Sequence, residues 1–182
     1  RHAGIFPDKM ARLVAIEGFG GRPPLRGDAK APLGERYRAW MEKMREATET
    51  PPLRYGDMDA TVKRMAEANS HLGPDQVRHL TQHGVNRNED GSYSWKFDTG
   101  IYARFMQPTG MRPPDGPDLW KLITCPTLLI RGGDSWGADP AETGDADHFQ
   151  NARVVTVDDA GHWVHHDQLD AFLALVRPFL AD

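Results

Sequence analysis

Three short apolar runs in this chain have the pattern of buried β-strands. They are Leu13–Ile16, Thr127–Ile130 and Arg153–Val157, and each is rich in β-branched or aliphatic residues. A strand covered on both faces shows such a continuous run, whereas a strand with one wet face alternates apolar and polar positions. We therefore predict an α/β fold with about three parallel strands and flanking helices.

Other segments have the spacing of amphipathic helices. From about Asp167 onward, apolar residues recur every three or four positions, so one face of the predicted helix is apolar. Its members are Leu169, Phe172, Leu173, Val176, Phe179 and Leu180. Between the first two strands the pattern predicts mainly helices, with one short strand after a turn. One helix starts near Gly34, and three more cover 58–69 (N-capped by Asp57), 74–84 and 100–106. The strand includes Tyr93, Trp95 and Phe97.

Charged side chains follow each of the three predicted strands. Glu17 follows the first, Asp134 the second, and His162 the third, directly after Gly161. The carboxyl ends of parallel strands meet at one edge of a sheet, where ligands bind in open α/β folds. Histidine transfers protons near neutral pH, and a nearby carboxylate orients its ring. We expect His162 to act as a base oriented by Asp134 or Glu17.

Three stretches resemble the α/β-hydrolase family. "GIFPDKMARLVAIEGFG" is similar to the family's segment after the nucleophile helix, "CPTLLIRGGDS" to the strand carrying its acid, and "VVTVDDAGHW" to the strand and loop carrying its histidine. The resemblance implies a partial α/β-hydrolase fold, with the core in residues 1–21 and 118–182. It also implies an inserted α-helical cap over 22–117, similar to caps of the serine-hydrolase-like branch.

The same resemblance implies hydrolysis of an ester-type small molecule by a nucleophile–histidine–acid triad. His162 matches the base, and Asp134 is favoured as the acid by its position relative to His162. Glu17 is the alternative, because haloalkane dehalogenases can carry the acid after this earlier strand. One departure weakens the preference: the family's acid usually lies three residues after the strand-ending glycine, and counting from Gly132 places Ser135 there.

Large aromatic residues stand beside these candidates. Trp136 and Trp163 flank the proposed acid and base, and Phe19 follows the first strand. We expect these three to line the substrate site, although packing of the core is the alternative role for each.

We expect no Gly-x-Ser-x-Gly nucleophile elbow anywhere in this chain. In the family that turn lies before the strand that Leu13–Ile16 resembles, so we expect the chain to be a C-terminal half that is inactive alone. Its first strand would then have an open edge along Arg12–Ile16, which favours self-association. Two alternatives stay open: an enzyme like haloalkane dehalogenases or epoxide hydrolases with an aspartate nucleophile, and a non-catalytic half-domain.

Composition limits the remaining classes. The net charge of −4 argues against a nucleic-acid partner, and no apolar stretch approaches the roughly 20 residues of a membrane span. The single cysteine, Cys125, excludes an internal disulfide and fits a cytoplasmic location. His162, His165 and His166 lack partners at a spacing typical of zinc sites. We expect neither a metal nor a cofactor.

Overall fold

The computed structural model of this chain describes residues 1–18, 31–98 and 115–181. It divides into two compact units. The first comprises Arg1–Pro23 with Met111–Asp182, and the second comprises Pro24–Gly110.

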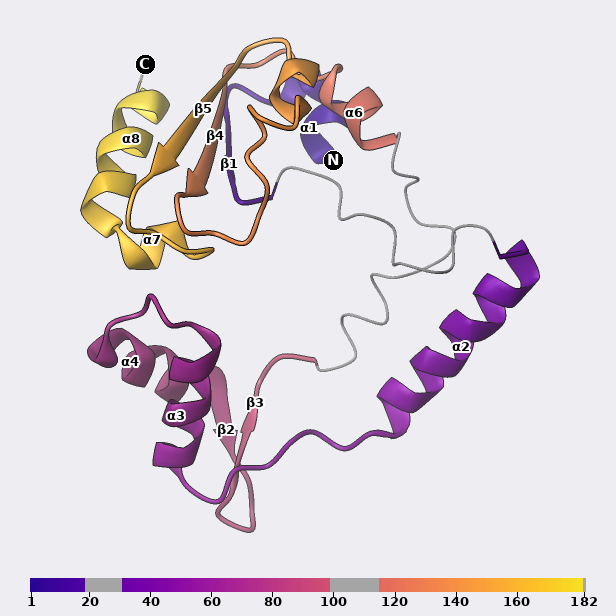
Figure 1. The fold of residues 1–182 in the computed structure, drawn as a ribbon, viewed down its shortest axis with the longest axis vertical. Coiled ribbons are helices and arrows are strands. Elements are labelled where there is room, and N and C mark those ends of the chain that lie inside the picture. The colour runs from indigo at the N-terminus through magenta and orange to yellow at the C-terminus, as the bar shows by residue number, and fades with distance from the viewer. Residues whose placement is uncertain (19–30, 99–114, 182) are drawn as a thin grey trace. The chain divides into compact units, whose positions relative to one another are not determined.

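A parallel three-stranded sheet is the framework of the first unit (Figure 1). Its strands are β1 (Leu13–Ile16), β4 (Thr127–Gly132) and β5 (Ala152–Val157), in the order β1-β4-β5. The three predicted strands are confirmed, and β4 extends two residues beyond the predicted Ile130. In the central strand β4, Leu128, Leu129 and Ile130 are all at most 1% exposed, which explains its continuous apolar run.

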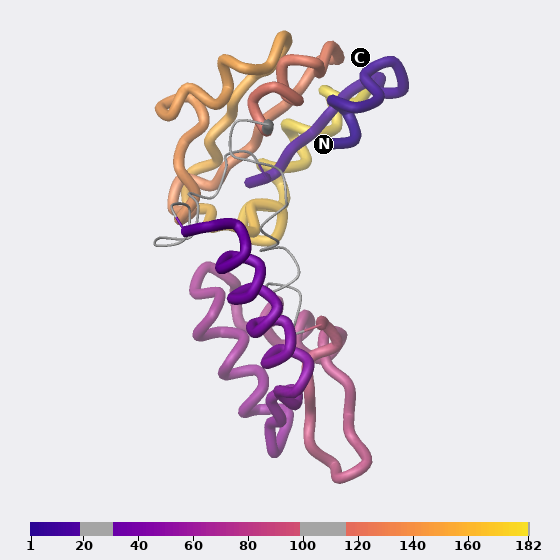
Figure 2. Tube along the Cα trace, turned by 90° about the vertical axis from the view of Figure 1, so that its right-hand side faces the viewer, coloured from indigo at the N-terminus to yellow at the C-terminus, as the bar shows by residue number. Residues whose placement is uncertain are grey.

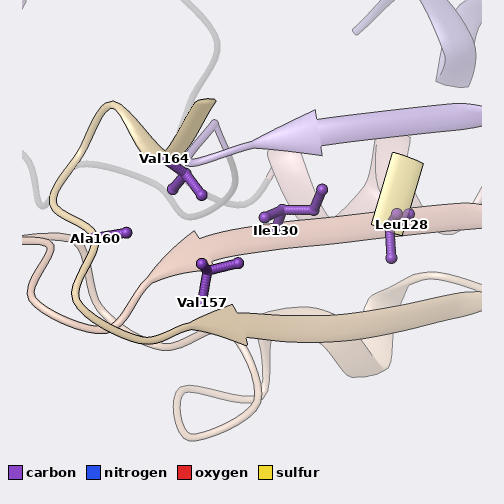
Figure 3. Packing of buried hydrophobic residues seen from close by; sticks show 5 residues of the cluster. All are labelled: Leu128, Ile130, Val157, Ala160 and Val164. Carbon is purple, nitrogen blue, oxygen red and sulfur yellow. The ribbon is translucent and has the colours of Figure 1, made fainter. Parts of the chain in front are cut away.

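The main core lies on one face of this sheet and around its carboxyl end. Leu128 and Ile130 of β4 lie near Val157, the last residue of β5, and near Ala160 in the following turn (Figure 3). Helix α8 (Leu169–Ala181) packs its inner residues against this cluster, while the short helix α7 (Val164–Asp167) contributes Val164. Leu169 and Leu180, predicted on the apolar face, are more than half exposed.

A second apolar cluster joins segments that are distant in sequence. Helix α1 (His2–Ile5) lies beside α6 (Asp115–Trp120), and the 3-10 helices η1 (Pro7–Lys9) and η2 (Asp145–His148) complete this part of the unit. Cys125 is buried in this cluster with Ala3 and Ile123.

The second unit is mainly helical. It contains α2 (Leu33–Glu49), α3 (Met58–Ala68), α4 (Pro74–Gly84) and an antiparallel hairpin of β2 (Val85–Arg87) and β3 (Tyr93–Trp95) (Figure 2). Asp57 caps α3 as predicted, because its side chain accepts a hydrogen bond from the Ala60 N–H at 2.7 Å. The helix predicted over 100–106 lies outside the described residues. None of the described helices is long and apolar enough to cross a membrane.

Candidate active site

Glu17 and His162 meet at the carboxyl end of the sheet. Glu17 directly follows β1, and His162 lies in the turn between β5 and α7. Atom Nδ1 of His162 is 3.2 Å from Oε2 of Glu17. The two side chains are separated by 145 positions in sequence and are brought together because β1 and β5 both flank β4 in parallel.

The Glu17 carboxylate is held by hydrogen bonds on both oxygens. Oε1 accepts from the Gly132 N–H at 2.7 Å, and Oε2 accepts from the Ser135 hydroxyl at 2.8 Å. The Ser135 oxygen in turn accepts from the Gly137 N–H at 3.2 Å. These contacts compensate the carboxylate for its burial, since the Glu17 side chain is only 6% exposed.

This arrangement suits a histidine that acts as a general base. The His162 side chain is 37% exposed, so it can be reached from outside while its carboxylate partner is shielded. With a proton on Nδ1, the ring donates to Glu17 and leaves Nε2 free to accept a proton. The Trp136 ring stacks on the imidazole, with centroids 4.6 Å apart and planes at 29°.

The other predicted site residues lie elsewhere. The Asp134 side chain is exposed, and no described residue hydrogen-bonds its carboxylate; only its backbone contacts the histidine turn. Trp163 packs against His166, with ring centroids 5.6 Å apart. Phe19 lies outside the described residues. The structure therefore brings Glu17 to His162, together with Trp136, and does not bring the Asp134 carboxylate there.

The expectation that the chain contains no Gly-x-Ser-x-Gly is wrong for the sequence around Ser135. Residues 133–137 read Gly-Asp-Ser-Trp-Gly, a literal match to Gly-x-Ser-x-Gly, although this match follows the second predicted strand. A nucleophile elbow requires a strained turn from a strand directly into a helix. Here no helix follows β4 until η2 at Asp145, and Ser135 has a negative φ. Its hydroxyl donates to Glu17, so the match has neither the backbone nor the hydrogen bonding of an elbow.

The turn carrying His162 rests directly on the end of β4. The Gly133 N–H donates to the Val157 carbonyl at 2.8 Å, and the Asp134 N–H donates to the Ala160 carbonyl at 3.0 Å. A Cβ at Gly132 would overlap the carbonyl oxygens of Ala160 and Gly161. Glycine at position 132 therefore allows the close approach that places His162 beside Glu17.

His165, three positions after His162, has a shifted pKa. Burial lowers the pKa of His165, the neighbouring His166 lowers it further, and the negative charge of Asp167 opposes the shift. His165 is therefore expected to be neutral near pH 7.

Within residues 1–18, 31–98 and 115–181, no three histidine, cysteine, aspartate or glutamate side chains gather where they could hold a metal ion.

The chain resembles known proteins along most of its length. A family model described as "Alpha/beta hydrolase family" matches residues 2–175. The mouse sn-1-specific diacylglycerol lipase ABHD11 is 31% identical over 97 residues, which are 50% of this chain and 29% of that protein.

Solved structures share the fold at low sequence identity. The thioesterase domain from the curacin biosynthetic pathway has a TM-score of 0.75 at 18% identity, over 97% of this chain and 60% of that one. An esterase from Mycobacterium tuberculosis has a TM-score of 0.70 at 21% identity, over 99% and 57% respectively. This chain thus spans less than two thirds of each of these proteins. Because the family model matches nearly the whole chain, this chain belongs to the alpha/beta hydrolase family.

Proposed function

We propose that this chain supplies the base and the orienting acid of an enzyme that hydrolyses ester-type small molecules. His162 is the base and Glu17 the acid. The observation that carries the proposal is the buried Glu17 carboxylate, 3.2 Å from Nδ1 of the partly exposed His162. A carboxylate that is shielded, hydrogen-bonded and in contact with Nδ1 fixes both the tautomer and the orientation of the ring.

In the proposed reaction the nucleophile comes from a segment preceding these residues. Nε2 of His162 takes the proton of a serine hydroxyl as its oxygen bonds to the ester carbonyl carbon. The imidazolium then gives that proton to the departing alcohol, leaving an acyl-enzyme. A water molecule attacks the acyl carbon, again with His162 taking its proton, and the acid product leaves as the serine is restored.

The geometry reverses the order of preference between the two acids. Position in the sequence favours Asp134, but its side chain is exposed and makes no hydrogen bond to a described residue, whereas the Glu17 side chain is buried and lies 3.2 Å from Nδ1 of His162. In the same proposal residues 22–117 are the helical cap, consistent with a separate compact unit over Pro24–Gly110.

Substitution of each acid in an active polypeptide tests these roles. The enzyme to use carries this chain together with its upstream coding sequence. We expect Glu17→Gln to lower kcat by about 10⁴-fold, the usual loss when the orienting carboxylate of a triad is removed. Asp134→Asn, the matched control, should stay near the wild-type rate. A crippled Asp134→Asn beside an active Glu17→Gln would overturn the assignment of the acid.

A second experiment addresses Ser135 as the rival nucleophile. This chain alone is assayed with p-nitrophenyl acetate, beside its Ser135→Ala and His162→Ala variants. We expect no hydrolysis beyond that of free imidazole at the same concentration. Turnover that disappears in Ser135→Ala would instead make Ser135 the nucleophile and contradict the proposed upstream one.

The upstream sequence separates the remaining alternatives. An aspartate in place of the elbow serine would move the enzyme to the haloalkane dehalogenase or epoxide hydrolase type, in which His162 activates only the water. Absence of any elbow upstream would leave a non-catalytic half-domain.

A further inference from the structure

We propose that Asp167 is a positioning residue for His162, acting through the peptide bond between Ala160 and Gly161. The inference rests on the proposed function only in so far as His162 is the base. It concerns a carboxylate that does not touch the imidazole and that the reaction described above does not use.

The Asp167 carboxylate binds the backbone immediately before His162. Its Oδ2 accepts a hydrogen bond from the Gly161 N–H at 2.8 Å. Asp167 is the last residue of α7, and its own N–H donates to the Trp163 carbonyl at 3.0 Å. The helical turn therefore folds the chain back, so that the Asp167 side chain reaches the Gly161 backbone six positions earlier and His162 lies within the resulting loop.

The same peptide bond is held on its other side by the turn that follows β4. The Ala160 carbonyl accepts from the Asp134 N–H at 3.0 Å, while the Gly161 N–H donates to Asp167. Both polar atoms of one peptide group are thus bound, one from the end of the sheet and one from α7. Ala160 and Gly161 are themselves buried, so these bonds replace solvent and fix the plane from which the His162 backbone continues.

Among the described residues, the Asp167 carboxylate accepts a hydrogen bond only from the Gly161 N–H. The other oxygen, Oδ1, is buried and has no hydrogen-bond partner among the described residues. The nearby charged or titratable groups are His165, whose pKa Asp167 raises, and its neighbour His166. Burying a carboxylate with one oxygen unpaired costs free energy. The hydrogen bond from Gly161 offsets part of this cost, because hydrogen bonds to charged groups are stronger than those between neutral groups.

Loosening this peptide should displace the ring. The contact between His162 Nδ1 and Glu17 Oε2 is already 3.2 Å long, and a misplacement of about 1 Å can cost roughly 10²-fold in rate. Asp167 therefore acts on the chemical step rather than on substrate binding.

Nuclear magnetic resonance on this chain tests the positioning without any need for activity. The variants are Asp167→Ala, which removes the acceptor, and Asp167→Asn, which keeps an acceptor oxygen without the charge. In Asp167→Ala we expect the Gly161 amide to exchange with solvent roughly ten- to a hundredfold faster and the imidazole nitrogen shifts of His162 to move toward a mixture of tautomers. In the Asn variant the exchange rate of the Gly161 amide and the His162 signals should stay close to wild type, and only the Gly161 amide proton should shift.

The Gly133 amide is the internal control, because it donates to Val157 and does not contact Asp167. Equal acceleration at Gly133 and Gly161 would show general destabilisation and overturn the proposal, as would unchanged His162 signals in Asp167→Ala or an Asn variant as disturbed as Ala. If Asp167→Ala does not fold, the Asn variant decides: replacing the carboxylate oxygen by an amide oxygen should shift the Gly161 amide proton and not that of Gly133.

Kinetics in the longer, active polypeptide separate this inference from the proposed function. There Asp167→Ala should lower kcat about tenfold to a hundredfold with KM nearly unchanged. If His162→Ala proves harmless, the proposed function fails, while the resonance data still decide whether Asp167 holds the His162 turn.

Discussion

Glu17 adopts a backbone conformation that glutamate rarely takes. Its φ is 56°, in the left-handed region, which costs on the order of 1 kcal/mol for a residue with a Cβ. The hydrogen bonds from Gly132 and Ser135 hold the side chain in place despite this strain. Strain that persists at a buried, hydrogen-bonded carboxylate supports a functional role for Glu17.

The neighbouring glycines allow a sharp test of how the site is assembled. In Gly132→Ala the added Cβ would overlap the Ala160 and Gly161 carbonyl oxygens, so the His162 turn must move. We expect the free energy of unfolding of the first unit to fall by about 1–3 kcal/mol, as for other overpacked sites. Urea denaturation followed through the β4 amide signals measures this unit alone.

Gly133→Ala is the matched control, because its Cβ would meet the Val157 carbonyl oxygen at an ordinary 3.5 Å and its φ is not positive. It should unfold near the wild-type midpoint. Similar losses in both variants would show that close approach at Gly132 is not what seats the turn.

At the scale of elements, the short helix α7 makes stability depend on pH. Burial lowers the pKa of His165 below its ordinary value of 6.5. Above that value neither the folded nor the unfolded chain binds the proton. As pH falls below 6.5, the unfolded chain takes up the proton first, so stability declines until the folded-state pKa is passed.

We therefore expect the urea midpoint of the first unit to decrease as the pH is lowered from about 7.5 to about 5.5. The decrease should be smaller in His165→Gln. The comparison of the two proteins cancels the titration of the other histidines. An identical decline in both would mean that His165 contributes nothing to this pH dependence.

The elements were largely predictable, and the acid was not. Continuous apolar runs identify strands such as β4 because a central strand loses its polar face, and Asp57 marks the start of α3 because a carboxylate satisfies free backbone N–H groups. Position in sequence also places Glu17, Asp134 and His162 at one sheet edge. It does not determine which way each side chain points, since this depends on the left-handed φ of Glu17 and on contacts made by residues more than a hundred positions away.

At the scale of the molecule, β1 is an edge strand. Among the described strands only β4 pairs with it. The Leu13 N–H donates to the carbonyl of Pro126, the residue before β4, and the Glu17 N–H donates to the carbonyl of Ile130 in β4. By the two-residue alternation of a parallel ladder, the N–H groups of Val14 and Ile16 face the other side. An unpaired edge of this kind is a template for another strand. We therefore propose that this chain self-associates through β1.

Hydrogen exchange measured over a range of protein concentrations tests this pairing without any substitution. The Val14 and Ile16 amides should become more slowly exchanging as concentration rises, in step with growth of the sedimenting species. The Leu13 and Glu17 amides are internal controls, because their hydrogen bonds to Pro126 and Ile130 are made within one copy of the chain. Dimers that form while Val14 and Ile16 keep exchanging rapidly would place the interface elsewhere. A monomer at every concentration would mean that the β1 edge does not pair with a second copy, because the ordering that pairing requires exceeds the free energy that the few backbone hydrogen bonds of a short strand return.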